Sequence, residues 1–92
     1  MIEQYIESLK GKTYKMLPIF EEDYPSFQIY AQGLAIELIG ATITFPRLKT
    51  EKHFIDIINI VNYFARHEID HKTCQKQVFK CLDLIERIWI EG

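Results

Sequence analysis

The chain has no excess of basic residues. Lysine and arginine together number 11 against 13 aspartates and glutamates, which gives a formal net charge of −2 at pH 7 and a pI of about 5.9. Proteins that bind nucleic acids depend on basic residues to neutralise phosphate groups. The composition therefore disfavours a nucleic-acid partner.

Long apolar runs are also missing. No stretch reaches the roughly 20 residues that a helix needs to cross a bilayer. The first ten residues, MIEQYIESLK, carry two glutamates and lack the basic and continuously apolar regions of a secretory signal. We expect a cytoplasmic protein with no membrane partner.

Cysteine is limited to Cys74 and Cys81. Their spacing in a helical pattern places the two Cα atoms about 10 Å apart, which is too far for a disulfide. We expect both cysteines to be reduced and buried in the core.

Motifs that mark an enzyme or a cofactor site are missing as well. The sequence contains no glycine-rich phosphate loop, no G-x-S-x-G motif and no cysteine and histidine placed as a nucleophile and its base. Ser8 and Ser26 have no obvious base. We expect neither enzymatic activity nor a cofactor.

Apolar residues at helical spacing are abundant, and the 48% hydrophobic and 26% charged composition is that of a globular chain. The pattern predicts helices over residues 2–22, 25–40, 51–66 and 71–90. The first carries a defect, because Pro18 would kink it or Gly11 would split it. Gly40 is the expected stop of the second helix, and Thr50 the expected N-cap of the third.

The segment ATITFPRLKT, residues 41–50, is the least helical part of the chain. Thr42, Ile43 and Thr44 are β-branched in succession, and Pro46 disfavours helix in the residue before it. We therefore predict an all-α domain over residues 1–92, a compact bundle of four to five helices with one extended connection. The apolar faces expected in the core of the second and fourth helices comprise Phe27, Tyr30, Ala31, Leu34, Ala35, Leu38 and Ile39, and Cys74, Val78, Cys81, Leu82, Ile85, Ile88 and Trp89.

Residues 67–71, HEIDH, fit the H-E-x-x-H pattern in which zinc peptidases bind a metal through two histidines and use the glutamate as general base. That chemistry requires His67, Glu68 and His71 on one continuous helix. A helix boundary is predicted inside the motif, because Asp70 fits an N-cap and its neighbours fit a hydrophobic staple. We therefore expect no metal site, and a zinc-dependent hydrolase is the disfavoured alternative.

Two short segments are candidates for contacting a protein partner. The segment IFEEDY places an acidic cluster beside a tyrosine and could meet a basic protein, although a charged run of this kind is usually only a solvated helix end. The segment FPRLK combines an aromatic residue with arginine, both favoured at binding hot spots, although it could also cap the core. The candidate partner-binding residues are Glu21, Glu22, Asp23, Tyr24, Phe45 and Arg47.

The segments YIESLKGKTYKMLPIFEED, residues 5–23, and VFKCLDLIERI, residues 78–88, resemble short helical proteins of bacterial accessory loci, among them immunity proteins of contact-dependent toxin systems. The resemblance implies a small intracellular protein that binds and neutralises one cognate toxin domain, often by covering its active cleft. A phage or mobile-element accessory protein, such as an assembly chaperone or an inhibitor of a host factor, is the alternative. A monomer and a homodimer both remain open.

Overall fold

The computed structural model describes the backbone of residues 2–91 and the side chains of residues 2–88. The regular elements of this part of the chain are all helices, with no strand among them, which confirms the predicted all-α bundle. The elements are α1 (Ile2–Tyr14), α2 (Met16–Glu22), α3 (Tyr24–Thr44), the 3₁₀-helix η1 (Pro46–Thr50), α4 (Lys52–Arg66) and α5 (His71–Glu91).

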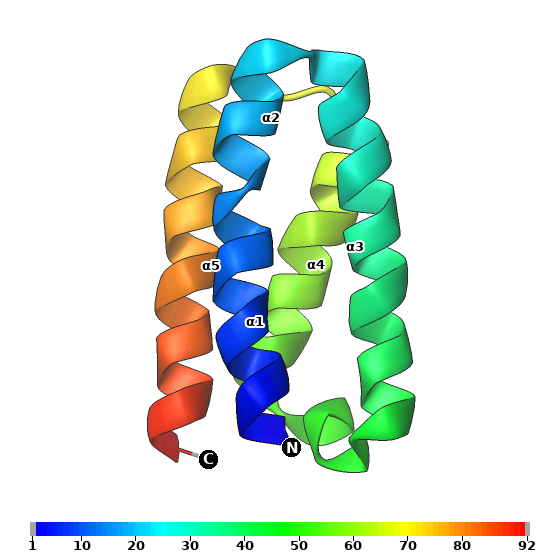
Figure 1. The fold of residues 1–92 in the computed structure, drawn as a ribbon, viewed down its shortest axis with the longest axis vertical. Coiled ribbons are helices and arrows are strands. Elements are labelled where there is room, and N and C mark those ends of the chain that lie inside the picture. Colours follow the sequence, from blue (N-terminus) through cyan, green and yellow to red (C-terminus); the bar gives the residue numbers. More distant parts are fainter. Residues whose placement is uncertain (1, 92) are drawn as a thin grey trace.

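The helices form a ring of four antiparallel rods (Figure 1). The first rod is α1 followed by α2, and it packs against α3 through α2 and against α5 through both helices. The ring closes because α4 packs between α3 and α5. Each rod therefore has two neighbours and one face turned away from the bundle, and α3 and α5 occupy opposite corners.

The predicted defect in the first rod lies at Lys15, between α1 and α2. A proline ring displaces the carbonyl of the residue four positions earlier and cannot donate a hydrogen bond to it. Pro18 therefore disturbs the carbonyl of Tyr14, where α1 ends. The backbone N–H of Lys15 still donates to the carbonyl of Gly11 at 3.0 Å, so the rod is interrupted at Lys15 and Gly11 does not split it.

Helix α3 does not stop at Gly40 but continues to Thr44, which corrects the predicted boundary and the predicted extended connection over residues 41–50. The hydroxyl of Thr42 donates to the carbonyl of Ile39 at 2.6 Å, which makes a threonine compatible with helix. The helix ends at Thr44, with Phe45 as its C-cap, because Pro46 disfavours helical backbone in the preceding residue.

The 3₁₀-helix η1 follows Phe45 directly, and α4 then begins with Glu51 as its N-cap in place of the predicted Thr50. The Glu51 side chain accepts a hydrogen bond from the backbone N–H of His53 at 3.2 Å. The connection between the two long helices is therefore compact and helical.

One hydrophobic core runs through the middle of the ring, and Phe27, Phe54 and Phe64 are its largest fully buried side chains. Most of the predicted core positions are buried. Three are corrected: Ile39 is exposed, and Tyr30 and Leu82 are only partly buried. On α5, Leu84 is buried instead of Leu82. The side chain of Trp89, predicted to face the core, lies outside the described residues.

Cys74 and Cys81 are free and buried in this core, as predicted. Burial raises the pKa of the Cys74 thiol to about 11 and that of the Cys81 thiol to about 12. Among the residues that the structure describes, no helix combines the length and the apolar character needed to span a membrane.

Candidate protein-binding surfaces

The HEIDH segment forms a corner between two helices. Helix α4 ends at Arg66 and α5 begins at His71, so the predicted helix boundary inside the motif is confirmed. The two histidines face different neighbours: the His67 ring stacks on Tyr63 with centroids 4.2 Å apart, and His71 Nε2 lies 3.2 Å from Glu21 Oε1. The two histidines therefore do not lie on one helix, as the metal site of a zinc peptidase requires.

No group of three or more histidine, cysteine, aspartate or glutamate side chains within residues 2–88 is arranged to hold a metal ion.

Asp70 caps α5. Its Oδ1 accepts a hydrogen bond from the backbone N–H of Thr73 at 2.8 Å, and its carbonyl accepts one from the N–H of Cys74 at 3.0 Å. Hydrogen bonds from the side chain and backbone of Thr73 lower the pKa of the Asp70 carboxyl. A lowered pKa in the folded state means that the cap stabilises the fold at neutral pH, and that this stabilisation is lost as the pH falls through the acid range.

We expect Asp70→Ala to lower the melting temperature at pH 7, whereas Asp70→Asn, which keeps a capping oxygen, stays closer to the wild type. The difference between wild type and Asp70→Ala should shrink as the pH is lowered into the range where the carboxyl protonates. Thermal unfolding followed by circular dichroism at pH 7 and pH 3 measures both effects. Equal melting temperatures of wild type and Asp70→Ala at pH 7 would contradict the capping role.

The acidic cluster predicted to meet a partner lies at the junction of α2 and α3. Glu21, Glu22 and Asp23 are all exposed, but two of them have roles within the chain. Glu21 contacts His71, and Asp23 caps α3 by accepting a hydrogen bond from the backbone N–H of Ser26 at 3.2 Å. Glu22 has no ion pair with the described residues.

Tyr24, the fourth predicted contact residue of this segment, ties the start of α3 to the HEIDH corner. Its hydroxyl accepts a hydrogen bond from the backbone N–H of Ile69 at 2.9 Å and donates to the carbonyl of His67 at 3.4 Å. Its ring packs against Phe20 and Phe27. The structure thus gives Tyr24 a role in holding the end of the bundle together.

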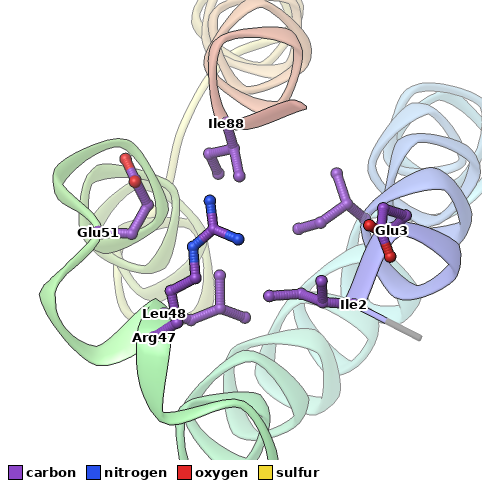
Figure 2. Close-up of a pocket in the computed structure, with 7 residues that line it drawn as sticks. Ile2, Glu3, Arg47, Leu48, Glu51 and Ile88 are labelled. Atoms are coloured by element: carbon purple, nitrogen blue, oxygen red, sulfur yellow. The ribbon is translucent and has the colours of Figure 1, made fainter. Parts of the chain in front are cut away.

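Phe45 and Arg47 lie at the other end of α3. The Phe45 ring is partly buried against Tyr5, with centroids 5.8 Å apart. Arg47 is exposed and lines a cavity of about 290 Å³ between α1, η1, the N-cap residue Glu51 and the end of α5. Figure 2 shows its guanidinium reaching toward Ile88, with Glu3 and Glu51 on opposite sides of the cavity.

The structure therefore does not bring the six predicted residues together. Four lie at the first end of α3 and two just beyond its second end, separated by a helix of 21 residues. At 1.5 Å per residue, that helix is about 30 Å long.

The surface between these two ends is one that the sequence analysis did not identify. Along its outward side α3 exposes four isoleucines: Ile29 at 69%, Ile36 at 72%, Ile39 at 52% and Ile43 at 76%. Ile29, Ile36 and Ile43 are spaced by seven residues and so lie in one row along the helix. We call the surface made by these four isoleucines with Gly33 and Gly40 the α3 face.

The α3 face carries no charge. Glu37 is the single charged residue of α3, and it is turned toward α1, where its carboxylate accepts hydrogen bonds from Lys12 Nζ at 2.9 and 3.0 Å and from the Tyr5 hydroxyl at 3.2 Å. The Tyr30 hydroxyl joins the same two helices by donating to the carbonyl of Lys12 at 2.8 Å. Exposed isoleucine is thus concentrated on a side of α3 that carries no charged side chain.

Two shallow hollows of about 380 Å³ each border the first part of this face. One lies toward α2 and includes Glu22 and Asp23, and the other lies toward α1 and includes Lys15 and Gly33. Ile29 and Tyr30 belong to both hollows. An apolar ridge flanked by two depressions is a surface into which a partner's side chains can pack.

A signal for this surface was present in the sequence. A helix that faces solvent on one side normally shows charged residues there, whereas α3 is apolar nearly all round. Such a helix is either enclosed by its own chain or covered by another molecule, and the bundle encloses only part of α3.

Comparison of the chain with models of protein families, with characterised proteins and with solved structures finds no match. The resemblance to immunity proteins of toxin systems therefore stays a prediction.

Proposed function

We propose that this chain is a protein-binding module that acts through the α3 face. The observation that carries the proposal is the row of exposed isoleucines on a helix whose outward side has no charge. The largest contiguous apolar patch on a small protein, typically about 300–600 Å², is often its interaction site. A bundle of this kind contributes a rigid helix, so a partner meets a surface that is already formed.

The surroundings of the α3 face match the usual anatomy of an interface, in which an apolar centre is bordered by polar residues. Glu22 and Asp23 lie beside Ile29 at the α2 end, so the acidic cluster identified from the sequence forms part of the border. A partner with an apolar centre and basic residues at one edge fits this surface.

The biological role that we propose is that of an immunity-type inhibitor, which binds a cognate toxin domain in the cytoplasm and blocks it. This role rests on the resemblance of residues 5–23 and 78–88 to immunity proteins. Inhibition by covering a cleft requires a protruding, preformed surface and no chemistry by the inhibitor. The α3 face supplies such a surface.

Growth rescue tests the proposal. The genes that flank the one for this chain are searched for a toxin domain, which is then expressed in a host cell together with wild type, Ile36→Glu or Phe79→Glu. Wild type and Phe79→Glu should restore growth, whereas Ile36→Glu should fail, because a charge buried at the centre of an interface costs tenfold or more in affinity. Phe79 is a matched control, because it is 49% exposed and lies on α5, at the opposite corner of the ring.

Two outcomes would overturn this proposal. Lack of rescue by the folded wild-type chain would remove the immunity role. Equal rescue by wild type and Ile36→Glu would remove the α3 face as the binding surface. Circular dichroism of the purified variants establishes that each is folded.

A further inference from the structure

We propose that a second copy of this chain covers the α3 face when no other partner is bound, and that the two α3 helices pair antiparallel about a two-fold axis at Ile36. This inference rests on the proposed function, because it takes the α3 face as the binding surface. It adds the identity of one partner and the geometry of the pair.

The isoleucine row is self-complementary in this arrangement. A two-fold axis at Ile36 brings together residues that lie at equal distances on either side of it along α3. Ile36 then meets Ile36 of the other copy, and Ile29 meets Ile43 at both ends of the row. The pairs Ile29–Ile43, Ile36–Ile36 and Ile43–Ile29 make three apolar layers between the two helices. Both copies contribute the same surface, as the symmetric interface of a homodimer requires.

The two glycines fit the same register. On one edge of the isoleucine row, Gly33 of one copy lies nearly level with Gly40 of the other, and small residues facing each other let two helices approach closely. Within its own chain neither glycine is needed for space, because a Cβ atom added at either position meets nothing within 4 Å. Glycine inside a helix costs stability, so its use at two surface positions of α3 is explained by a neighbour outside the chain.

The charges at the two ends of α3 select the antiparallel direction. Glu22 and Asp23 lie at the start of α3, whereas the exposed side chain of Lys49 follows its end. Glu21 contacts His71, and Arg47 reaches into the cavity at the end of the bundle. In the antiparallel pair the acidic end of each copy lies at the same end of the interface as the basic end of the other. A parallel pair would place acidic residues on acidic residues and basic on basic, which is unfavourable.

The area available is enough for a weak dimer. From their exposed fractions, the four isoleucines present about 500 Å² per copy, at the upper part of the range for the largest apolar patch of a small monomer. Two such faces with their borders bury about 1,000 Å² or somewhat more in total, which is close to the lower limit for a specific interface. The dimer should therefore dissociate on dilution, so that another partner can compete for the face.

Sedimentation equilibrium of the full chain tests this inference over micromolar to submillimolar concentrations. The wild type and Phe79→Glu should move from the mass of one chain, 10.9 kDa, toward twice that mass as concentration rises. Ile36→Glu should remain at one chain throughout, because two glutamates would meet at the axis. A wild type that stays at one chain, or an Ile36→Glu variant that associates equally well, overturns the inference.

Cross-linking tests the direction of the pair. The variants Ile29→Cys and Ile43→Cys are mixed and treated with a short bismaleimide; the native thiols are buried and react slowly. Antiparallel pairing predicts that links between position 29 and position 43 exceed links between like positions. An excess of 29–29 and 43–43 links would establish a parallel pair and overturn the geometry.

The results also separate this inference from the proposed function. A monomeric wild type whose growth rescue is lost in Ile36→Glu removes the homodimer and keeps the α3 face as the site for the toxin domain. A dimer abolished by Ile36→Glu, with growth rescue intact in that variant, keeps self-association and removes the α3 face from inhibition.

Discussion

Replacing Phe27 by alanine is expected to lower the free energy of unfolding by about 3–5 kcal/mol, the usual cost of removing a large aromatic side chain from a core. Phe27 is fully buried near the start of α3. Its ring centroid lies 5.0 Å from that of Phe20, 5.8 Å from Tyr24 and 5.5 Å from Phe64, so one side chain joins α2, α3 and α4. The cavity left by alanine would therefore open where three helices meet.

Urea denaturation followed by circular dichroism measures this loss. Phe79→Ala is the matched control, because it removes the same atoms from a position that is 49% exposed. Its effect should be much smaller, within about 1 kcal/mol of the wild type. Similar losses in the two variants would show that Phe27 is not at the centre of the core.

The second large effect concerns two neighbouring residues of α3. Leu38 is fully buried, whereas Ile39 is 52% exposed on the α3 face. Leu38→Ala should lower the free energy of unfolding by about 2–5 kcal/mol. Ile39→Ala should change it by less than about 1 kcal/mol, because the lost burial is small and alanine is a better helix former than isoleucine.

This pair of variants distinguishes the two sides of α3 without any partner. The side chains are nearly equal in volume, and the substitutions remove similar numbers of atoms. Urea denaturation at low protein concentration keeps the wild type monomeric, so the comparison reports on the fold alone. A loss at Ile39 as large as that at Leu38 would mean that the α3 face is covered by the chain itself.

The sequence predicted helix limits well where one residue type has one strong local effect. Asp70 accepts a hydrogen bond from a free backbone N–H group at the start of α5, so its position predicts the corner between α4 and α5. The same residue shows that the HEIDH pattern contains a helix boundary and not one continuous helix. Pro18 lacks a backbone donor, so an interruption of the first rod could be expected.

The end of α3 was not predictable from the same local rules. Gly40 stops a helix only when it adopts left-handed backbone, and no described glycine of this chain does so. The β-branched run Thr42, Ile43 and Thr44 has only a modest preference against helix. The buried Ala41 in the same turn holds this part of α3 against the bundle. Pro46 then supplies the stop.

The α3 face escaped the sequence analysis for a physical reason. The pattern of apolar and polar residues assigns a buried face only when the two kinds alternate around the helix, and α3 is apolar on both sides. Ile39 was therefore placed in the core. The candidate residues chosen for charge or aromatic character, such as Asp23 and Tyr24, serve instead to cap and connect helices of the bundle.

The central claim, that the α3 face is the binding surface, is tested most directly by the isoleucine methyl signals of the folded protein. In a spectrum of chain labelled at isoleucine δ1 methyl groups, raising the concentration or adding the toxin domain should shift the signals of Ile29, Ile36, Ile39 and Ile43. The buried Ile57 and Ile85 serve as internal controls and should stay nearly unchanged. Unchanged α3 signals, with shifts confined to isoleucines on other helices, would contradict the claim.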